Sequence, residues 1–376
     1  MARVLIIGGG FAGLAAAGRL SGPAAHGRFQ VTLADRRDTH QFLPVLPDLV
    51  GRDIRPEDVQ YPLAEAAHAY GFRFVPEAVK SVDLGGRTAV TDSGATLPFD
   101  FLLVASGSES DFHGREDCRG QALTLHSVAD VLALRAAARD ERTAAMVVAG
   151  GGYTGVEGAT NLWRAARGRE SPLRIVIVET GAALCAALPP RFQAYIGRNV
   201  RSLGIEVRTG TAVAEVSGGT VQLSSGESLD RARLLWAAGV CTSALVRALP
   251  AEKTPNGRLL VDESLRFAPG CFAAGDAAAF RRDGQPLRMG VQFSLSEGAA
   301  AADNIRRAAE GRPLRGFRPF DPGYLVPMAN GRACGKVLGA GLRGRLPMAL
   351  HYAMCLLRLR GMGRRWGLLR SLLRRE

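Results

Sequence analysis

The sequence has few cysteines, and they follow no pattern. They are Cys118, Cys185, Cys241, Cys271, Cys334 and Cys355. None forms a Cys-x-x-Cys pair or another spacing typical of metal ligands, and this usage suits a reducing compartment such as the cytosol. The six histidines are also scattered, and we expect His40, His113 and His351 at surfaces or interfaces. We therefore predict no metal site.

Features of a secretory signal peptide and of a membrane-spanning helix are also lacking. The first apolar strand pattern begins at Val4, and no cleavage-site pattern follows it. A mainly apolar stretch over 346–357 is shorter than the roughly 20 residues that a bilayer span needs. We expect a cytoplasmic protein that does not cross the membrane.

Acidic residues are in the minority, and the excess of positive charge is concentrated near one end. The formal net charge is +13, and residues 343–376 hold nine arginines against one acid, Glu376. Aromatic residues do not alternate with these arginines as a base-stacking surface would require, so we expect no nucleic-acid partner.

A glycine motif is present twice. The first copy follows the apolar run Val4 to Ile7 and reads Gly-x-Gly-x-x-Gly over 8–13, before an alanine-rich helical pattern. The second copy has the same spacing over 150–155. The first glycine permits a tight turn, the second lets the backbone approach a pyrophosphate, and the third lets helix and strand pack closely. The helix N-terminus then directs amides at the anion, so two dinucleotides are predicted.

An acidic residue completes each motif. Asp35 ends the apolar run that begins at Val31, and Glu179 ends the run RIVIVE. A carboxylate at this point accepts hydrogen bonds from ribose hydroxyls and repels a 2′-phosphate. The pattern favours FAD and NADH over NADPH.

The two halves of the chain resemble each other beyond the glycines. Residues 71–107 and 204–239 both alternate short strands with Gly-Gly or Ser-Gly turns, and each ends in a buried strand and a glycine. This repetition indicates a duplicated α/β unit. The predicted fold has two Rossmann-like dinucleotide-binding domains. The FAD domain spans 1–110 and 253–320, the NADH domain 111–252, and a C-terminal acceptor-side and membrane segment 321–376.

Several stretches together resemble the type II NADH:quinone oxidoreductases, within the larger group of two-dinucleotide flavoprotein reductases. They are FLLVASGS at 101–108, CFAAGDAAAF at 271–280, GGGYTGVEGA at 150–159, RMGVQFSLSEGAAAADNI at 288–305 and QFLPVLPDLVGR at 41–52. The resemblance covers roughly residues 3–363. It implies non-covalent FAD, NADH as substrate and a membrane quinone as electron acceptor. Val291, Ser106 and Ser296 depart from residues common in the family.

The resemblance and the motifs together assign residues to the FAD site. They are Gly8, Gly10, Phe11, Ala12, Gly13, Asp35, Arg36, Pro44, Val79, Ala105, Ser106, Gly107, Gly275, Asp276, Val291 and Gln292. The resemblance places the Gln292 amide near the quinone carbonyl, and the alternative is a residue that ties loops together. Asp276 is expected to bind FAD, or else to cap a helix.

A second set of residues is assigned to NADH. They are Gly150, Gly152, Tyr153, Thr154, Gly155, Glu157, Glu179, Ala238 and Gly239. Glu157 is expected to orient the nicotinamide ribose or amide, although a first-turn glutamate also complements a helix dipole. Tyr153 is expected either to stack on the nicotinamide side of the flavin or to serve only in packing.

The C-terminal residues predict two amphipathic helices separated near Gly361 and Gly363. Apolar side chains lie on one side, with Trp366 among them, and arginines fall mostly opposite. Over 346–376 this pattern favours peripheral, monotopic attachment to an anionic membrane at its cytoplasmic face. The alternatives are a helix that forms a homodimer and a solvated basic tail.

Other functions remain open. Sulfide:quinone oxidoreductases share the predicted fold but use a pair of redox cysteines beside the flavin. Cys334 resembles one member of this pair. The other member often lies at the position of residues 156–162, which contain no cysteine here. A soluble NADH-dependent reductase leaves the basic tail unexplained. A flavoprotein that senses NADH would hold the nucleotide and turn over slowly.

Overall fold

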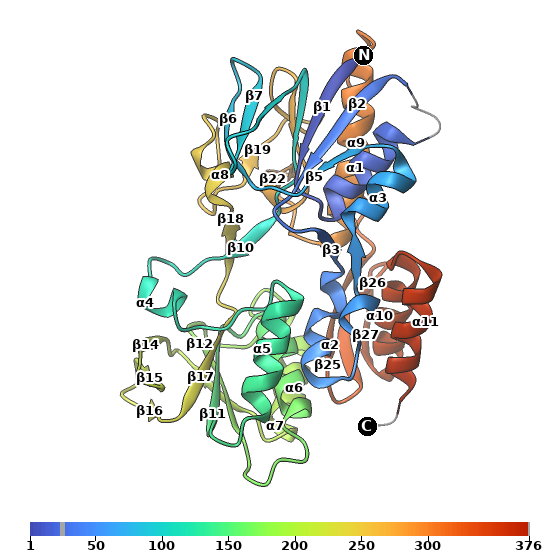
Figure 1. The fold of residues 1–376 in the computed structure, drawn as a ribbon. Helices are drawn as coiled ribbons and strands as arrows, with labels where there is room; N and C mark the ends of the chain where they lie inside the picture. Colours follow the sequence, from blue (N-terminus) through green and yellow to red (C-terminus); the bar gives the residue numbers. More distant parts are fainter. Residues whose placement is uncertain (23–26, 375–376) are drawn as a thin grey trace. The chain divides into compact units, whose positions relative to one another are not determined.

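A computed structural model describes residues 1–22 and 27–374 and divides the chain into two compact units (Figure 1). Each unit is discontinuous in sequence. Unit 1 comprises Met1–His40, Gln60–Glu109 and Val240–Asp321, and unit 2 comprises Gln41–Val59, Ser110–Gly239 and Pro322–Glu376.

Unit 1 is built on a six-stranded sheet in the order β20-β21-β9-β1-β2-β5. The strands are β1 (Ala2–Ile7), β2 (Phe29–Ala34), β5 (Arg73–Val75), β9 (Phe101–Val104), β20 (Arg266–Ala268) and β21 (Cys271–Ala273). All pairings are parallel except that of β20 with β21. The continuous apolar run of β1 fits this sheet because successive side chains point to opposite faces and both faces are covered. Accordingly, Ile6 and Leu5 lie in different core clusters.

Helices α1 (Phe11–Ser21), α3 (Leu63–Tyr70) and α9 (Val291–Ala309) accompany this sheet (Figure 1). Helix α9 packs directly on α1, where a side chain on Gly298 would collide with the Ala12 carbonyl. A second, antiparallel sheet follows the order β6-β7-β8. The remaining elements near or within this unit are β6 (Val79–Asp83), β7 (Thr88–Thr91), β8 (Thr96–Pro98), β3 (Thr39–Gln41), β4 (Gln60–Pro62), β10 (Ser108–Ser110), β18 (Val240–Thr242), α8 (Ala244–Ala248), β19 (Leu259–Leu260), η4 (Gly275–Ala277), β22 (Ala278–Ala279), β23 (Arg281–Arg282) and β24 (Gln285–Pro286).

Unit 2 repeats the arrangement with a parallel sheet in the order β13-β12-β11-β17. An antiparallel sheet again inserts before its last strand, in the order β14-β15-β16. The elements are α4 (Glu116–Arg119), α5 (Val128–Arg139), β11 (Ala145–Ala149), α6 (Tyr153–Ala165), β12 (Arg174–Glu179), α7 (Pro190–Ser202), β13 (Glu206–Thr209), β14 (Val213–Ser217), β15 (Thr220–Leu223), β16 (Ser228–Leu229) and β17 (Ala232–Trp236). The predicted duplication of an α/β dinucleotide-binding fold is therefore confirmed.

The C-terminal residues pack within unit 2 on its own β-meander and helices. The meander runs β25-β26-β27, and α10 lies against β26. The segment 41–59 belongs to the same unit, with α2 packed on α5 and α6 and η3 packed on α11. These elements are η2 (Leu43–Val45), α2 (Leu46–Gly51), η3 (Pro56–Asp58), β25 (Gly323–Met328), β26 (Arg332–Val337), β27 (Ala340–Gly344), α10 (Arg345–Arg358) and α11 (Met362–Leu373). The two predicted C-terminal helices are present, with their break at 359–361.

The compact units divide the chain differently from the predicted boundaries. Residues 240–252 pack in unit 1, because Val246 and Leu249 are buried in a core cluster with Ile7 of β1. Residues 41–59 and 322–376 pack in unit 2 instead of forming part of the FAD domain and a separate segment. The described helices include none that is long and apolar enough to span a bilayer.

Candidate functional site: two dinucleotide loops

The first glycine loop connects β1 to α1 in unit 1. Gly8 has a φ of +107°, and a side chain there would collide with the Ala105 carbonyl. A side chain on Gly13 would collide with the Gly8 carbonyl oxygen, whereas nothing lies within 4 Å of a Cβ built on Gly10. Each predicted role of the glycines is thus visible: a turn, a close helix packing and an open approach at the N-terminus of α1.

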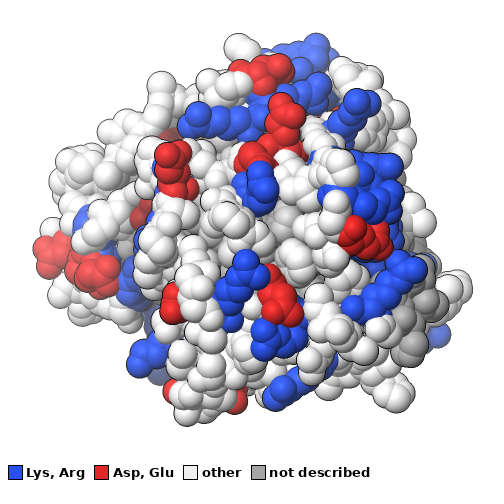
Figure 2. Space-filling model, turned by 90° about the horizontal axis from the view of Figure 1, so that it is seen from above, with Lys and Arg blue, Asp and Glu red and all other residues white. Residues whose placement is uncertain are grey.

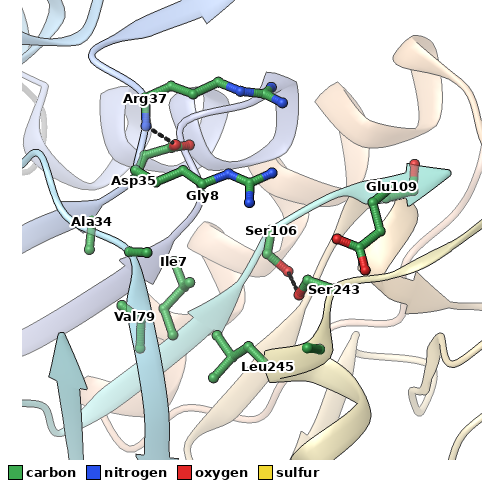
Figure 3. Close-up of a pocket in the computed structure, with 14 residues that line it drawn as sticks. Ile7, Gly8, Ala34, Asp35, Arg37, Val79, Ser106, Glu109, Ser243 and Leu245 are labelled. Atoms are coloured by element: carbon green, nitrogen blue, oxygen red, sulfur yellow. Dashed lines mark hydrogen bonds between the residues drawn. The ribbon is translucent and has the colours of Figure 1, made fainter. Parts of the chain in front are cut away.

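Asp35 holds this loop in shape. Its Oδ2 accepts a hydrogen bond of 2.6 Å from the Gly9 amide, and its Oδ1 accepts one of 2.8 Å from the Arg37 amide (Figure 3). The carboxylate therefore joins the end of β2 to the glycine turn.

A cavity of about 250 Å³ opens beside Asp35. Of the predicted FAD residues it is lined by Gly8, Asp35, Arg36, Val79 and Ser106. Sequence reasoning missed Arg37, Ser108, Glu109 and the segment Ser243–Leu245, which re-enters unit 1 after the second domain. The Ser106 and Ser243 hydroxyls lie 3.4 Å apart and join the two chain segments (Figure 3). No sequence motif marks Ser243 as a lining residue, because it reaches this cavity only through the return of the chain into unit 1.

The other predicted FAD residues lie elsewhere. Phe11 and Ala12 open α1, and Ala105 and Gly107 follow β9, as the sequence pattern suggests. Pro44 lies in η2, which belongs to unit 2.

The Gly275-Asp276 turn is supported by neighbouring polar side chains, two of which are buried. Asp276 accepts a 2.7 Å hydrogen bond from the Ser108 hydroxyl, and it lies inside η4, whose N-cap is Ala274, so the capping alternative does not apply. Glu297 of α9 is 1% exposed, and its Oε2 accepts a 2.7 Å hydrogen bond from the Gly275 amide. Burial raises the pKa of Glu297 to about 8. Glu297 and its neighbour Arg258, which is also buried, were missed because a lone glutamate in an alanine-rich helix carries no motif.

Val291 and Gln292 begin α9 directly after its N-cap, Gly290. Both side chains are half-buried. The Gln292 amide lies over Gly290, since a Cβ on that glycine would be 3.3 Å from the Gln292 Oε1.

The second glycine loop reproduces the first in unit 2. Gly150 has a φ of +103°, and a side chain on Gly155 would collide with the Gly150 carbonyl oxygen. Glu179 takes the place of Asp35. Its Oε2 accepts a hydrogen bond of 2.7 Å from the Gly151 amide, and its Oε1 accepts one of 2.6 Å from the Gly181 amide. The acid thus secures the glycine turn in both units.

A cavity of about 480 Å³ adjoins this loop. Its lining includes the predicted residues Gly150, Gly152, Glu179, Ala238 and Gly239. It also includes residues that were missed, among them His113, Arg115, Thr180 and Trp236. The His113 Nε2 lies 3.0 Å from the Ala238 carbonyl oxygen, and this histidine is exposed, as expected, while it also lines the pocket.

The remaining residues of the NADH prediction lie on α6. Tyr153 faces Tyr324 of β25, with ring centroids 6.0 Å apart. This contact is of the kind expected if Tyr153 serves in packing. Thr154 is exposed next to it. Glu157 lies beyond the first turn of α6, which begins after the N-cap Gly152. The dipole alternative is therefore weakened, because that effect fades within the first turn.

Of the histidines expected at surfaces or interfaces, His40 is buried and His351 is half-buried, so neither lies at an open surface. His40 is 7% exposed, and its Nδ1 lies 3.1 Å from the Gly9 carbonyl oxygen. His351 is half-buried, and burial lowers its pKa. Among residues 1–22 and 27–374, no group of three or more His, Cys, Asp or Glu side chains could hold a metal ion.

Each of the two α/β units has a parallel sheet and a glycine loop that is held by an acidic side chain. Together these features define an oxidoreductase of the two-dinucleotide class. The chain belongs to the pyridine nucleotide-disulphide oxidoreductase family, whose model matches residues 2–302. It is 32% identical to an NADH dehydrogenase-like protein of Mycobacterium tuberculosis, over 89% of this chain and 86% of that protein. It is 26% identical to the type II NADH:quinone oxidoreductase of Staphylococcus saprophyticus, over 91% of each chain.

Solved structures agree on the fold. The NDH2 of Plasmodium falciparum in complex with NADH superposes with a TM-score of 0.86 at 15% identity, covering 99% of this chain and 97% of that one. A sulfide:quinone oxidoreductase of Aquifex aeolicus gives a TM-score of 0.78 at 17% identity, covering 98% and 92%. Fold alone therefore does not separate the two activities.

Proposed function

We propose that this protein is a type II NADH:quinone oxidoreductase. The observation that carries the proposal is the pair of acid-braced glycine loops, and whole-length relatives of that name support the choice of acceptor. Unit 1 would bind FAD and the sheet of unit 2 would bind NADH.

The residues of unit 1 fit FAD. The α1 amides at the open face of Gly10 would hold the pyrophosphate, and Asp35 with the cavity beside it would hold the ribose end. FAD would supply the hydride-accepting and electron-donating chemistry. Asp276 and the first turn of α9, with Val291 and Gln292, would bind the rest of the cofactor.

In unit 2 the second loop would bind and orient NADH. The N-terminus of α6 would hold its pyrophosphate, and Glu179 would face the adenosine ribose. Glu157 would orient the nicotinamide end. In unit 1, Gln292 would direct its side-chain amide toward a quinone carbonyl. These residues bind and position, and none is required as a nucleophile.

The cysteines give little support to sulfide chemistry. Burial raises the pKa of Cys334 to about 11, and burial with the charge of Cys334 raises the pKa of Cys185 to about 12. The thiolate is the reactive form, so buried thiols of this kind are poor nucleophiles at neutral pH.

Anaerobic stopped-flow spectroscopy tests the proposed reaction. The purified holoenzyme should lose its flavin absorbance rapidly with NADH and slowly with NADPH, and a soluble quinone should restore it. Absence of bleaching by either nucleotide would refute the proposal, and bleaching by sulfide would select the alternative enzyme. Rapid bleaching without reoxidation by quinone would favour a sensor or another acceptor.

We also propose that α10 and α11 attach the protein to an anionic membrane at its cytoplasmic face. Large apolar side chains on these helices are exposed: Leu346 (62%), Met354 (39%), Leu357 (70%), Met362 (65%), Trp366 (55%) and Leu373 (72%). Arg364 and Arg370 lie among them on α11, and attraction to anionic lipid would add to apolar burial. Basic side chains also lie on the face in Figure 2, with acidic ones among them.

Deletion of 346–376 would remove buried residues such as Met348 and Leu368 and disturb unit 2. Point variants are therefore the better test. Leu357→Glu with Trp366→Glu should release the protein from phosphatidylglycerol vesicles, while Phe320→Glu, which changes an equally exposed side chain of unit 1, should not. Equal vesicle binding by all three proteins would contradict attachment through these helices, and dissociation of a dimer by the double variant would favour the dimerisation alternative.

A further inference from the structure

Two buried charged side chains of unit 1 hold the backbone around the Gly275-Asp276 turn. Glu297 of α9 is 1% exposed, and Arg258 is 6% exposed. The proposed function uses Asp276 to bind FAD but assigns nothing to these two residues. Glutamate and arginine are almost never fully buried unless polar groups pair with them, so their hydrogen bonds identify what they hold.

The backbone before Asp276 is held by Glu297. The Gly275 amide donates a 2.7 Å hydrogen bond to the Glu297 Oε2. Gly275 has a φ of +70°, and a Cβ built on it would lie 3.2 Å from the Ser294 Oγ and 3.3 Å from the Ala12 Cβ. The amide is thus fixed in a left-handed turn that fits tightly between α9 and α1.

The backbone after Asp276 is held by Arg258. Its Nε donates a 2.8 Å hydrogen bond to the Ala278 carbonyl, and its Nη1 donates one of 2.8 Å to the Leu287 carbonyl. The planar guanidinium group presents its donors in a fixed geometry, so these two bonds set the direction in which the chain leaves the turn. Asp276 therefore lies between two anchored stretches of backbone.

The turn is also tied to both elements that would meet FAD. The Asp276 Oδ2 accepts a 2.7 Å hydrogen bond from the Ser108 hydroxyl, and Ser108 lines the cavity of unit 1. Gly298, next to Glu297, lets α9 approach the Ala12 carbonyl at the start of α1. The hydrogen bonds around the turn therefore connect the helix that would hold the pyrophosphate with the cavity that would hold the ribose end.

We propose that Glu297 and Arg258 are positioning residues for FAD, which hold the backbone on both sides of Asp276 so that its carboxylate is in place before the cofactor binds. The inference rests on the proposed function, because it requires Asp276 to contact FAD. Without Glu297 the buried Gly275 amide would lose its acceptor, and the turn would leave its binding geometry for part of the time. The apparent Kd for FAD would rise as the population of the binding geometry falls.

A double-mutant cycle on FAD binding tests the proposal, with the Kd measured from flavin fluorescence as each holoenzyme is diluted. Glu297→Leu removes the acceptor and should raise the Kd by about tenfold. Glu297→Gln keeps an acceptor for the Gly275 amide and should stay within about twofold of the wild-type Kd. In the Asp276→Ala background, Glu297→Leu should have almost no further effect, because the side chain that it positions is gone.

Asn304→Leu is the matched control on the same helix. Asn304 is 2% exposed, and its Nδ2 donates hydrogen bonds of 2.9 Å to the Ser264 and Arg315 carbonyls, about two turns beyond Glu297. This substitution also removes buried hydrogen bonds, so it should lower the thermal stability as Glu297→Leu does. The Kd for FAD should nevertheless stay within about twofold of the wild-type value.

Four results would overturn the inference: an unchanged Kd in folded Glu297→Leu, an unchanged Kd in Asp276→Ala, an equal rise caused by Glu297→Leu in the Asp276→Ala background, or an equal rise in Asn304→Leu. Each differs from failure of the proposed function, in which the purified wild-type protein holds no FAD or its flavin is not bleached by NADH.

If Glu297→Leu does not fold, Arg258→Lys takes its place in the cycle. Lysine keeps the positive charge but lacks the planar fork that joins the Ala278 and Leu287 carbonyl groups. A Kd that Arg258→Lys leaves unchanged, or raises equally with and without the Asp276 side chain, then overturns the inference.

Discussion

Replacement of Glu297 by glutamine isolates the contribution of one buried carboxyl to stability. Glu297 is 1% exposed, and burial raises its pKa from 4.5 to about 8. In the unfolded chain the carboxyl ionises near its ordinary pKa, whereas in the folded protein it stays protonated up to about pH 8. The native state therefore binds more protons over this interval, and this contribution to the free energy of unfolding is lost as pH rises.

The magnitude follows from the size of the shift. One pH unit corresponds to about 1.4 kcal/mol, so between pH 5 and pH 8 the wild-type protein should lose about 4 kcal/mol relative to Glu297→Gln. Glutamine retains the acceptor for the Gly275 amide and cannot ionise. Below about pH 5 the two proteins should differ only by a constant packing term.

Urea unfolding of the holoenzyme at several pH values measures this difference. Flavin fluorescence would report on unit 1, while tryptophan fluorescence would report on unit 2, because Trp163, Trp236 and Trp366 all belong to that unit. Only the flavin transition should show the altered pH dependence.

Glu310→Gln is the control, since hydrogen bonding to Arg312 lowers the pKa of this exposed residue at the end of α9 and keeps it ionised throughout. Parallel pH dependences for wild type and Glu297→Gln would refute the reasoning, because they would show that Glu297 is already ionised in the folded protein.

Three further substitutions separate the two dinucleotide loops. Gly13→Ala would drive its Cβ into the Gly8 carbonyl and should cost about 1–3 kcal/mol at the first loop; the FAD content of the purified protein should fall. Gly155→Ala makes the same clash with the Gly150 carbonyl in the second loop. It should raise the KM for NADH by about tenfold or more, while the FAD content stays normal. A loss of FAD in this variant would contradict the assignment of the loops. Glu179→Gln removes the charge that repels a 2′-phosphate, so the ratio of kcat/KM for NADH over NADPH should fall by about tenfold; an unchanged ratio would show that Glu179 serves only to brace Gly151.

The parts of the fold that sequence predicts well are those with local causes. The apolar run of β1, the glycine turn and the alanine-rich α1 lie next to one another in the chain, so their pattern suffices. The same holds for the break between α10 and α11 near Gly361. By contrast, the packing of α2 in unit 2 depends on Gly51 meeting Asn161, residues separated by more than a hundred positions.

The candidate site follows the same division. Asp35 and Glu179 are predictable because each lies at or just after the end of the next strand, at a similar distance from its glycines. Glu297 and Arg258 are not, because burial by distant segments, and not a motif, gives each its unusual environment. Nothing in the local sequence distinguishes them from exposed charged residues.

The residues that follow the two acids differ, and this difference explains how similar loops could retain one dinucleotide and exchange the other. Arg36 and Arg37 follow Asp35 and line the cavity in unit 1, whereas the neutral Thr180 and Gly181 follow Glu179. Two guanidinium groups beside the cavity in unit 1 would add long-range attraction for the phosphates of a resident cofactor, whereas the lining of the cavity in unit 2 holds one guanidinium, that of Arg115.

Arg36→Thr with Arg37→Gly transfers the second sequence into the first loop. Because Arg36 is exposed and Arg37 half-buried, solvent screens their charges and the effect should be moderate, with the Kd for FAD rising about threefold to tenfold. The increase should be larger at low ionic strength and shrink as salt is added, as measured by flavin fluorescence after ultrafiltration. Thr180→Arg is the reciprocal variant and should slow release of NAD⁺. A Kd for FAD that is unchanged at low salt would show that the glycine loop and Asp35 alone retain the cofactor.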